Sequence, residues 1–214
     1  MTSPSKIRSL FNRLAGKDKQ PILIVSGLPR SGTSMMMKML EAGGLPPLTD
    51  EIRVADGDNP KGYYEFEPVK ALRKGDFSWL PEAQGKVVKV IATLLPYLPD
   101  TYTYRVIFIH REMREVLASQ KKMLLNRGED PDKVSDDEIA RIYEKHLKQV
   151  DEWMRTQPNL QHIEVSYNQM IQNPTPEIER INQFLGGILD TQKMSQAIDV
   201  SLYRQRSEKS PSRS

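Results

Sequence analysis

The order of apolar and polar positions along the chain predicts strands that alternate with helices. Apolar runs or alternating patterns predict strands over 22–25, 86–91, 104–109 and 162–167. Apolar residues at helical spacing predict helices over 33–41, 68–74 and 112–125, a long helix opened by the capping box 135–138, and one that starts at 175–176. The continuous run 22–25 is typical of a strand buried on both faces. The pattern therefore predicts an α/β fold, a parallel β-sheet flanked by helices.

A glycine-bracketed loop joins the first predicted strand to the first predicted helix. Gly27 and Gly32 keep the Walker A spacing, G-x-x-x-x-G, but Thr33 stands where that motif has a lysine. Glycine lets the backbone approach an anion, and a helix start presents its N–H groups to one. Arg30 offers a planar, bidentate grip on phosphate or sulfate oxygens. These features predict a phosphate or phosphosulfate site in a P-loop NTPase-like three-layer α/β/α fold; a turn without ligand is the alternative.

Composition narrows the classes of function. The chain has 214 residues, enough for one domain, which we place at 21–206. A net charge of +3 is too weak to argue for nucleic acid. With no cysteine and three histidines that lack ligand spacing, no metal site is predicted. No apolar stretch approaches the length of a transmembrane helix, and we expect a cytoplasmic protein.

The two ends of the chain differ in pattern from the domain between them. Residues 1–20 form a basic, amphipathic lead-in with apolar residues at helical spacing. We expect this segment to pack against the domain or to be partly ordered, and peripheral contact with an acidic membrane surface is the alternative. The polar tail 207–214 is expected to be disordered. The sequence indicates no oligomeric state.

Three segments, in the expected order, resemble the short, bacterial-type sulfotransferases that use 3′-phosphoadenosine 5′-phosphosulfate (PAPS). Segment 28–34 resembles the family's 5′-phosphosulfate loop. Segment 109–119 resembles its 3′-phosphate motif, in which an arginine closing a strand and a serine eight residues later, here Arg111 and Ser119, hold one phosphate. Segment 163–170 resembles a later strand and turn. For this match, Ser119 must face the carboxyl edge of the sheet although it lies two helical turns from the strand.

The resemblance implies transfer of the sulfuryl group from PAPS to an acceptor hydroxyl or amine by metal-independent in-line displacement, leaving the product PAP. The acceptor would be a small molecule, a sugar or a peptide. Arg30 would stabilise charge on the leaving phosphate, and Lys89 falls where the family has a second catalytic lysine. The residues implied to bind PAPS are Arg30, Ser31, Gly32, Thr33, Ser34, Arg111, Ser119, Tyr167 and Arg204.

A general base must take the proton of the acceptor. Small-molecule members of the family use a histidine two residues after the lysine, and this chain has Ile91 there. Other members use a glutamate from the loop after the first helix. The candidates are Glu51, Glu65 and Glu67, with Asp50 behind them. We favour Glu65 because its aromatic neighbours can shield it from water, and place Glu51 second.

Two other functions remain open on the sequence. One is a nucleoside or small-molecule kinase with a degenerate loop, which would bind ATP with magnesium but lacks the loop lysine. The other is a protein that binds PAPS or PAP without turnover, a reading that the missing histidine favours.

Overall fold

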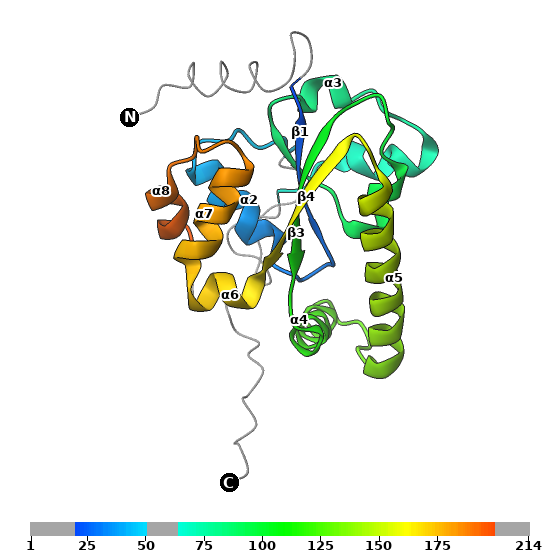
Figure 1. Cartoon of the computed structure of the whole chain (residues 1–214). Coiled ribbons are helices and arrows are strands. Elements are labelled where there is room, and N and C mark those ends of the chain that lie inside the picture. Colours follow the sequence, from blue (N-terminus) through cyan, green and yellow to red (C-terminus); the bar gives the residue numbers. More distant parts are fainter. Residues whose placement is uncertain (1–19, 51–63, 200–214) are drawn as a thin grey trace.

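A four-stranded parallel sheet forms the centre of the computed structural model, which describes residues 20–50 and 64–199 (Figure 1). The strands are β1 (Ile22–Gly27), β2 (Val87–Lys89), β3 (Tyr104–His110) and β4 (Leu160–Ser166). They lie in the order β2-β1-β3-β4, and every neighbouring pair is parallel. The predicted α/β class is confirmed.

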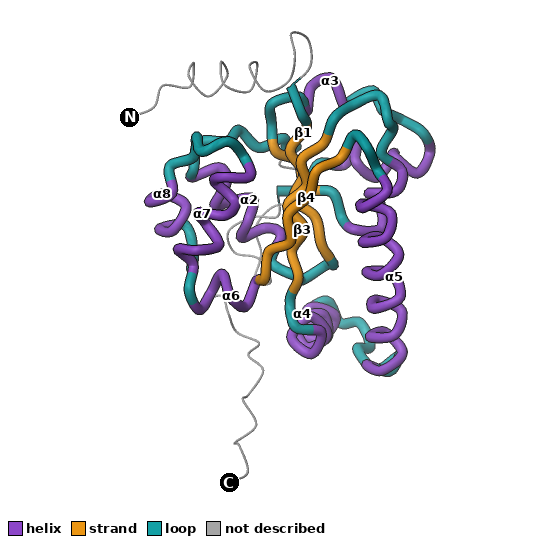
Figure 2. The backbone as a smooth tube through the Cα atoms, in the orientation of Figure 1, coloured by secondary structure: helices purple, strands orange, loops and turns teal. Residues whose placement is uncertain are grey.

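Helices cover both faces of this sheet, as Figure 2 shows by its colours. They are α2 (Thr33–Ala42), the 3-10 helix η2 (Glu67–Lys74), α3 (Leu80–Ala83), the 3-10 helix η3 (Ala92–Tyr97), α4 (Met113–Asn126), α5 (Asp136–Thr156), α6 (Tyr167–Gln172), α7 (Pro174–Phe184) and α8 (Thr191–Gln196). One buried apolar cluster joins α2, α6, α7 and α8 to one face. A second cluster joins η2, α3, η3 and α5 to the other, which gives three layers.

The position of β1 between two buried clusters explains why its sequence is apolar without alternation. All six of its residues are buried. Leu23 and Val25 belong to the cluster under α2, whereas Ile22 and Ile24 belong to the cluster under α5. A strand that contributes to both cores needs apolar side chains in both directions.

The chain leaves neighbouring strands toward opposite faces of the sheet. After β1 it enters α2, which packs in the first cluster. After β3 it passes through α4 into α5, which packs in the second. Such a divergence opens a crevice at the carboxyl ends of the two strands, where open α/β sheets bind ligands. Arg30 and Arg111 follow these two strand ends.

Several predicted boundaries are wrong, each for a local reason. The strand predicted over 86–91 spans only Val87–Lys89, because the chain turns into η3 directly after Ile91. Tyr167 does not end β4 but begins α6, since Ser166 Oγ accepts a hydrogen bond from Gln169 N and caps that helix. The helix predicted over 68–74 is 3-10. The serine half of the predicted capping box is confirmed: Ser135 Oγ accepts from Glu138 N at 3.3 Å.

Some predictions concern parts of the chain outside the described residues. They include most of the lead-in 1–20, the tail 207–214, Glu51 and Arg204. Among the helices that are described, none combines the length and the apolar character needed to cross a bilayer.

Candidate functional site

The loop between β1 and α2 is held in a backbone conformation that side chains rarely adopt. Arg30 has a φ of 69°, and Gly32 has a φ of 104°. A non-glycine residue in this region is uncommon, and such strain persists where the surroundings hold it in place. At Gly27 an added Cβ would lie 2.6 Å from Ser31 Oγ and 2.7 Å from the carbonyl oxygen of Ile109, so this position requires glycine.

Contacts from α4 and from the residue that follows β3 hold Arg30 in place. Its Nε donates to Ser119 Oγ at 2.9 Å, and Arg111 Nη1 donates to the carbonyl oxygen of Arg30 at 3.1 Å. Ser119 therefore does face the carboxyl edge of the sheet, as the resemblance requires. The loop arginine, the strand-end arginine and the helix serine form one cluster, although Arg30 and Ser119 are 89 positions apart in sequence.

A buried carboxylate orients Arg111. Arg111 Nε donates to Glu115 Oε2 at 2.9 Å, and the two side chains are 7% and 1% exposed. Glu115 Oε1 accepts from Asn168 Nδ2 at 3.1 Å, and Asn168 Oδ1 accepts from the Glu112 amide at 3.2 Å. Sequence reasoning missed Glu115 and Asn168. The available signal was the spacing of Arg111 and Glu115, four residues apart, which on a helix usually marks only a surface pair.

Tyr167 closes one side of the loop. The Arg111 guanidinium lies over its ring, with Cζ 4.5 Å from the ring centroid. A Cβ added to Gly32 would lie 2.3 Å from Tyr167 Cδ2, so the ring and the loop backbone are in close contact. Burial raises the pKa of the Tyr167 hydroxyl, which the nearby Arg111 partly opposes. The hydroxyl is therefore neutral at physiological pH.

The start of α2 completes an anion-binding arrangement. No side chain caps this helix, and its first turn holds no acidic residue. Ser31 is 1% exposed, and its Oγ has no hydrogen-bond partner among the described residues. Lys89 Nζ, from the end of β2, lies 3.4 Å from Ser34 Oγ in the first turn. Helix amides and the three cations Arg30, Lys89 and Arg111 suit a ligand with more than one negative charge.

Of the two favoured candidate bases, Glu65 and Glu51, the structure describes only Glu65. The carbonyl oxygen of Glu65 accepts from Thr49 Oγ1 at 2.9 Å and from the Asp50 amide at 3.3 Å, which anchors the chain just before η2. Neighbouring Tyr64 donates from its hydroxyl to Glu41 Oε2 at 2.5 Å. Glu51 and Arg204 lie outside the described residues.

A pocket of about 460 Å³ adjoins the loop. Its walls come from three elements: Leu28 and Pro29 before Arg30, the chain that follows β2, and α5. The lining residues are Leu28, Pro29, Ile91, Ala92, Thr93, Ile142, Tyr143, Lys145, His146 and Gln149. Tyr143 donates from its hydroxyl to Gln120 Oε1 at 2.6 Å, which ties this wall to α4 next to Ser119. Pockets of this size bind small molecules.

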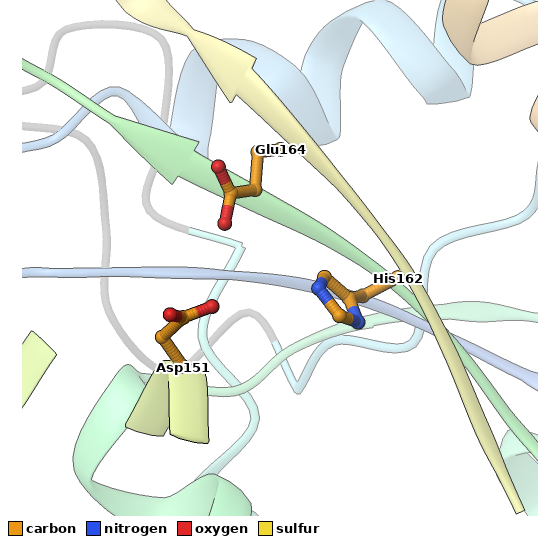
Figure 3. Close-up of side chains that lie close together, drawn as sticks. All are labelled: Asp151, His162 and Glu164. Atoms are coloured by element: carbon orange, nitrogen blue, oxygen red, sulfur yellow. The ribbon is translucent and has the colours of Figure 1, made fainter. Parts of the chain in front are cut away.

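A second cluster lies between α5 and the edge strand β4. Figure 3 shows Asp151, His162 and Glu164 with their side chains turned toward one another, and their ligand atoms lie within 4.8 Å of each other. Histidine spacing along the chain predicted no such grouping. Asp151 Oδ2 already forms an ion pair with Arg155 Nη2 at 3.0 Å, and Glu164 is largely exposed. We assign this cluster no role in the site beside the loop.

Comparisons with known proteins identify the family and the fold. A family model described as a sulfotransferase domain matches residues 20–213. The sulfotransferase domain of the Synechococcus PCC 7002 olefin synthase is 17% identical, with 93% of this chain and 92% of that chain covered and a TM-score of 0.54. Sulfotransferase STF1 of Mycobacterium tuberculosis H37Rv is 15% identical, with 91% and 74% covered and a TM-score of 0.56. At these identities the likeness shows a shared fold. No curated protein sequence matches.

Proposed function

Since the chain belongs to the sulfotransferase family, we propose that it moves the sulfuryl group from PAPS to the hydroxyl or amine of a small acceptor. The observation that carries the proposal is the cluster of Arg30, Ser119 and Arg111, because the donor is an anion with two separate phosphate-bearing ends. Arg111 and Ser119 would hold the 3′-phosphate. Residues 30–34 and the amides of α2 would hold the 5′-phosphosulfate.

The residues at the loop suit an in-line displacement. PAPS supplies an activated sulfuryl group on a phosphate that leaves as part of PAP. Arg30 and Lys89 place positive charge where the leaving phosphate gains negative charge, and positioned cations of this kind lower the barrier without a metal. The ring of Tyr167, packed on Gly32 and Arg111, shields the same region from water.

The pocket beside Leu28 and Pro29 is the proposed acceptor site. It opens next to the loop, so an acceptor within it would lie beside the phosphosulfate. Its walls are largely apolar, which favours an acceptor with an apolar body and one reactive polar group. For the proton of that group, the sequence nominates Glu65 and then Glu51, and both stay predictions.

Thermal unfolding with and without PAP tests the proposal. A ligand at 100 times its dissociation constant stabilises the folded state by about 2.7 kcal/mol. For a chain of this size that is a rise in Tm of about 5 to 10 °C. We expect this rise with PAP in the absence of magnesium, and none in Ser119→Ala or Arg111→Ala. Arg155→Ala, an exposed arginine on α5, is the matched control and retains the rise.

ATP with and without magnesium distinguishes the competing kinase. A magnesium-dependent rise with ATP and no response to PAP would refute the sulfotransferase assignment of the site. A response to PAP that persists in both Ser119→Ala and Arg111→Ala would refute the assignment of these two residues to the 3′-phosphate.

A further inference from the structure

A helix and the edge of the sheet bring three potential metal ligands together, away from the phosphosulfate loop. Asp151 lies on α5, and His162 and Glu164 lie on β4, the last strand in the sheet order. Each side chain offers one ligand atom, and the three atoms lie within 4.8 Å of one another (Figure 3). The proposed sulfuryl transfer gives none of these side chains a task.

The fold fixes the direction of these side chains. His162 and Glu164 are two residues apart on a strand, so both face the same side of the sheet. Their register partners on β3, Val106 and Phe108, belong to the buried cluster beneath α5, so this is the side that α5 covers. Asp151 meets them from α5, directly after a residue of that cluster. The spacing of the three side chains is therefore set by a packed boundary between a helix and the sheet.

Two buried polar atoms at this place have no hydrogen-bond partner among the described residues. They are Asp151 Oδ1 and His110 Nε2. His110 Nε2 lies 3.9 Å from Glu164 Oε2, which is beyond hydrogen-bond distance. Asp151 Oδ2 pairs with Arg155, but the Arg155 side chain is 67% exposed and the pair leaves Oδ1 for another partner. Buried polar atoms nearly always have a partner, and exceptions can mark the place of a bound ion.

The types of ligand atom select the class of metal. Imidazole nitrogen suits zinc and similar transition ions, whereas Mg²⁺ and Ca²⁺ prefer oxygen alone. Zn²⁺ binds histidine nitrogen and carboxylate oxygen at about 2.0–2.2 Å, and it can take three protein ligands and one water. Ligand atoms of one such ion are at most about 4 Å apart, so small side-chain rotations bring this set to bonding distance. The Glu164 side chain is 49% exposed, so the ion can enter from solvent.

We propose that Asp151, His162 and Glu164 bind one Zn²⁺ or a similar divalent transition ion, with water as the fourth ligand. The two carboxylates balance the charge of the ion. The ion clamps α5 to β4 and takes no part in sulfuryl transfer, so the inference does not depend on the proposed function. Because α5 also forms one wall of the pocket beside the loop, the clamp holds that wall against the sheet.

Zinc binding is measured on the whole chain after treatment with a chelator and dialysis, without PAP. Competition with a chromogenic zinc indicator gives the affinity and the stoichiometry, and thermal unfolding gives the stabilisation. We expect one Zn²⁺ per chain and, at about 100 times its dissociation constant, a rise in Tm of about 5 to 10 °C. Mg²⁺ and Ca²⁺ should give no rise. Co²⁺ should give the intense visible absorption of a four-coordinate site.

Single variants identify the ligands. Asp151→Asn, His162→Gln and Glu164→Gln each replace a ligand by a neutral amide of similar size. Loss of a residue that only orients a metal ligand weakens binding by about 10- to 100-fold, so each of these variants should lose at least that much affinity for Zn²⁺. Glu152→Gln, at an exposed carboxylate next to Asp151, and His146→Gln, elsewhere on α5, are the matched controls and keep the wild-type affinity.

Four results would overturn the inference. They are wild-type zinc affinity in all three ligand variants, an equal response to Mg²⁺, a Co²⁺ spectrum like that of the hydrated ion, and loss of binding in His110→Gln but not in Asp151→Asn. The last would move the ion to the end of β3. The Co²⁺ spectrum of the wild type decides the matter if a variant does not fold. The PAP shift, measured in chelator, is a separate readout: its absence would refute the proposed function and leave the zinc site standing.

Discussion

Replacement of Glu115 by alanine should be among the most damaging single changes at the site. Glu115 bonds both Arg111 Nε and Asn168 Nδ2, and its side chain is 1% exposed. Alanine leaves the guanidinium of Arg111, 7% exposed, without its carboxylate. Breaking a buried ion pair from one side costs about 3 to 5 kcal/mol. We therefore expect the free energy of unfolding to fall by at least about 3 kcal/mol, and Tm by about 6 to 12 °C.

Urea denaturation of a double-mutant cycle measures this coupling. The cycle consists of Arg111→Met, Glu115→Leu and the double variant. When both charges are removed, neither partner of the pair is left as a buried, unpaired charge. The double variant should therefore lose about 1 to 3 kcal/mol less free energy of unfolding than the sum of the two single variants. Glu82→Ala is the control, because Glu82 and Lys86 form an ion pair at the same spacing on the surface. An exposed pair of this kind is worth at most about 1 kcal/mol.

Two results would refute the reasoning. One is a loss in Glu115→Ala no larger than that in Glu82→Ala. The other is additivity of the two single changes, which would mean that Arg111 and Glu115 contribute independently. Either would show that the pair does not act as a buried unit and that Arg111 is oriented by other contacts.

Three further changes test the loop and the helix that frames the pocket. Gly32→Ala puts a Cβ 2.3 Å from the Tyr167 ring at a φ of 104°, so we expect a loss of at least about 2 kcal/mol in urea denaturation. Gly128→Ala, at a φ of 71° in open space, should cost less, and an equal cost would contradict the overlap argument. Lys89→Met should lower kcat by about 10²–10³-fold in transfer assays yet retain the PAP shift. An unchanged kcat with a lost PAP shift would mean that Lys89 serves binding alone. Ser135→Ala should destabilise the protein by about 1 kcal/mol through loss of the α5 cap, and no change would deny that cap any energetic role.

Local signals in the sequence were read with most success where the physical cause is also local. The apolar run 22–25 indicates burial on both faces, because each side chain of a strand contacts only the layer above or the layer below the sheet. The serine cap of α5 acts within one helical turn. At Ile91 and Tyr167 the local pattern was ambiguous, because an apolar or aromatic residue at a strand end fits a strand and a helix start equally well.

The sequence by itself determined the alternation of strands and helices and the glycine-bracketed loop, because both depend on residues within a few positions of each other. Which side chains meet at the loop was decided by tertiary structure. Ser119 reaches Arg30 only because α4 follows a strand that neighbours β1 in the sheet. Glu115 is buried, and not a surface partner of Arg111, because Asn168 covers it from α6. His146 lines a pocket with Leu28 because α5 packs back over the chain that follows β2, a contact that no spacing along the chain encodes.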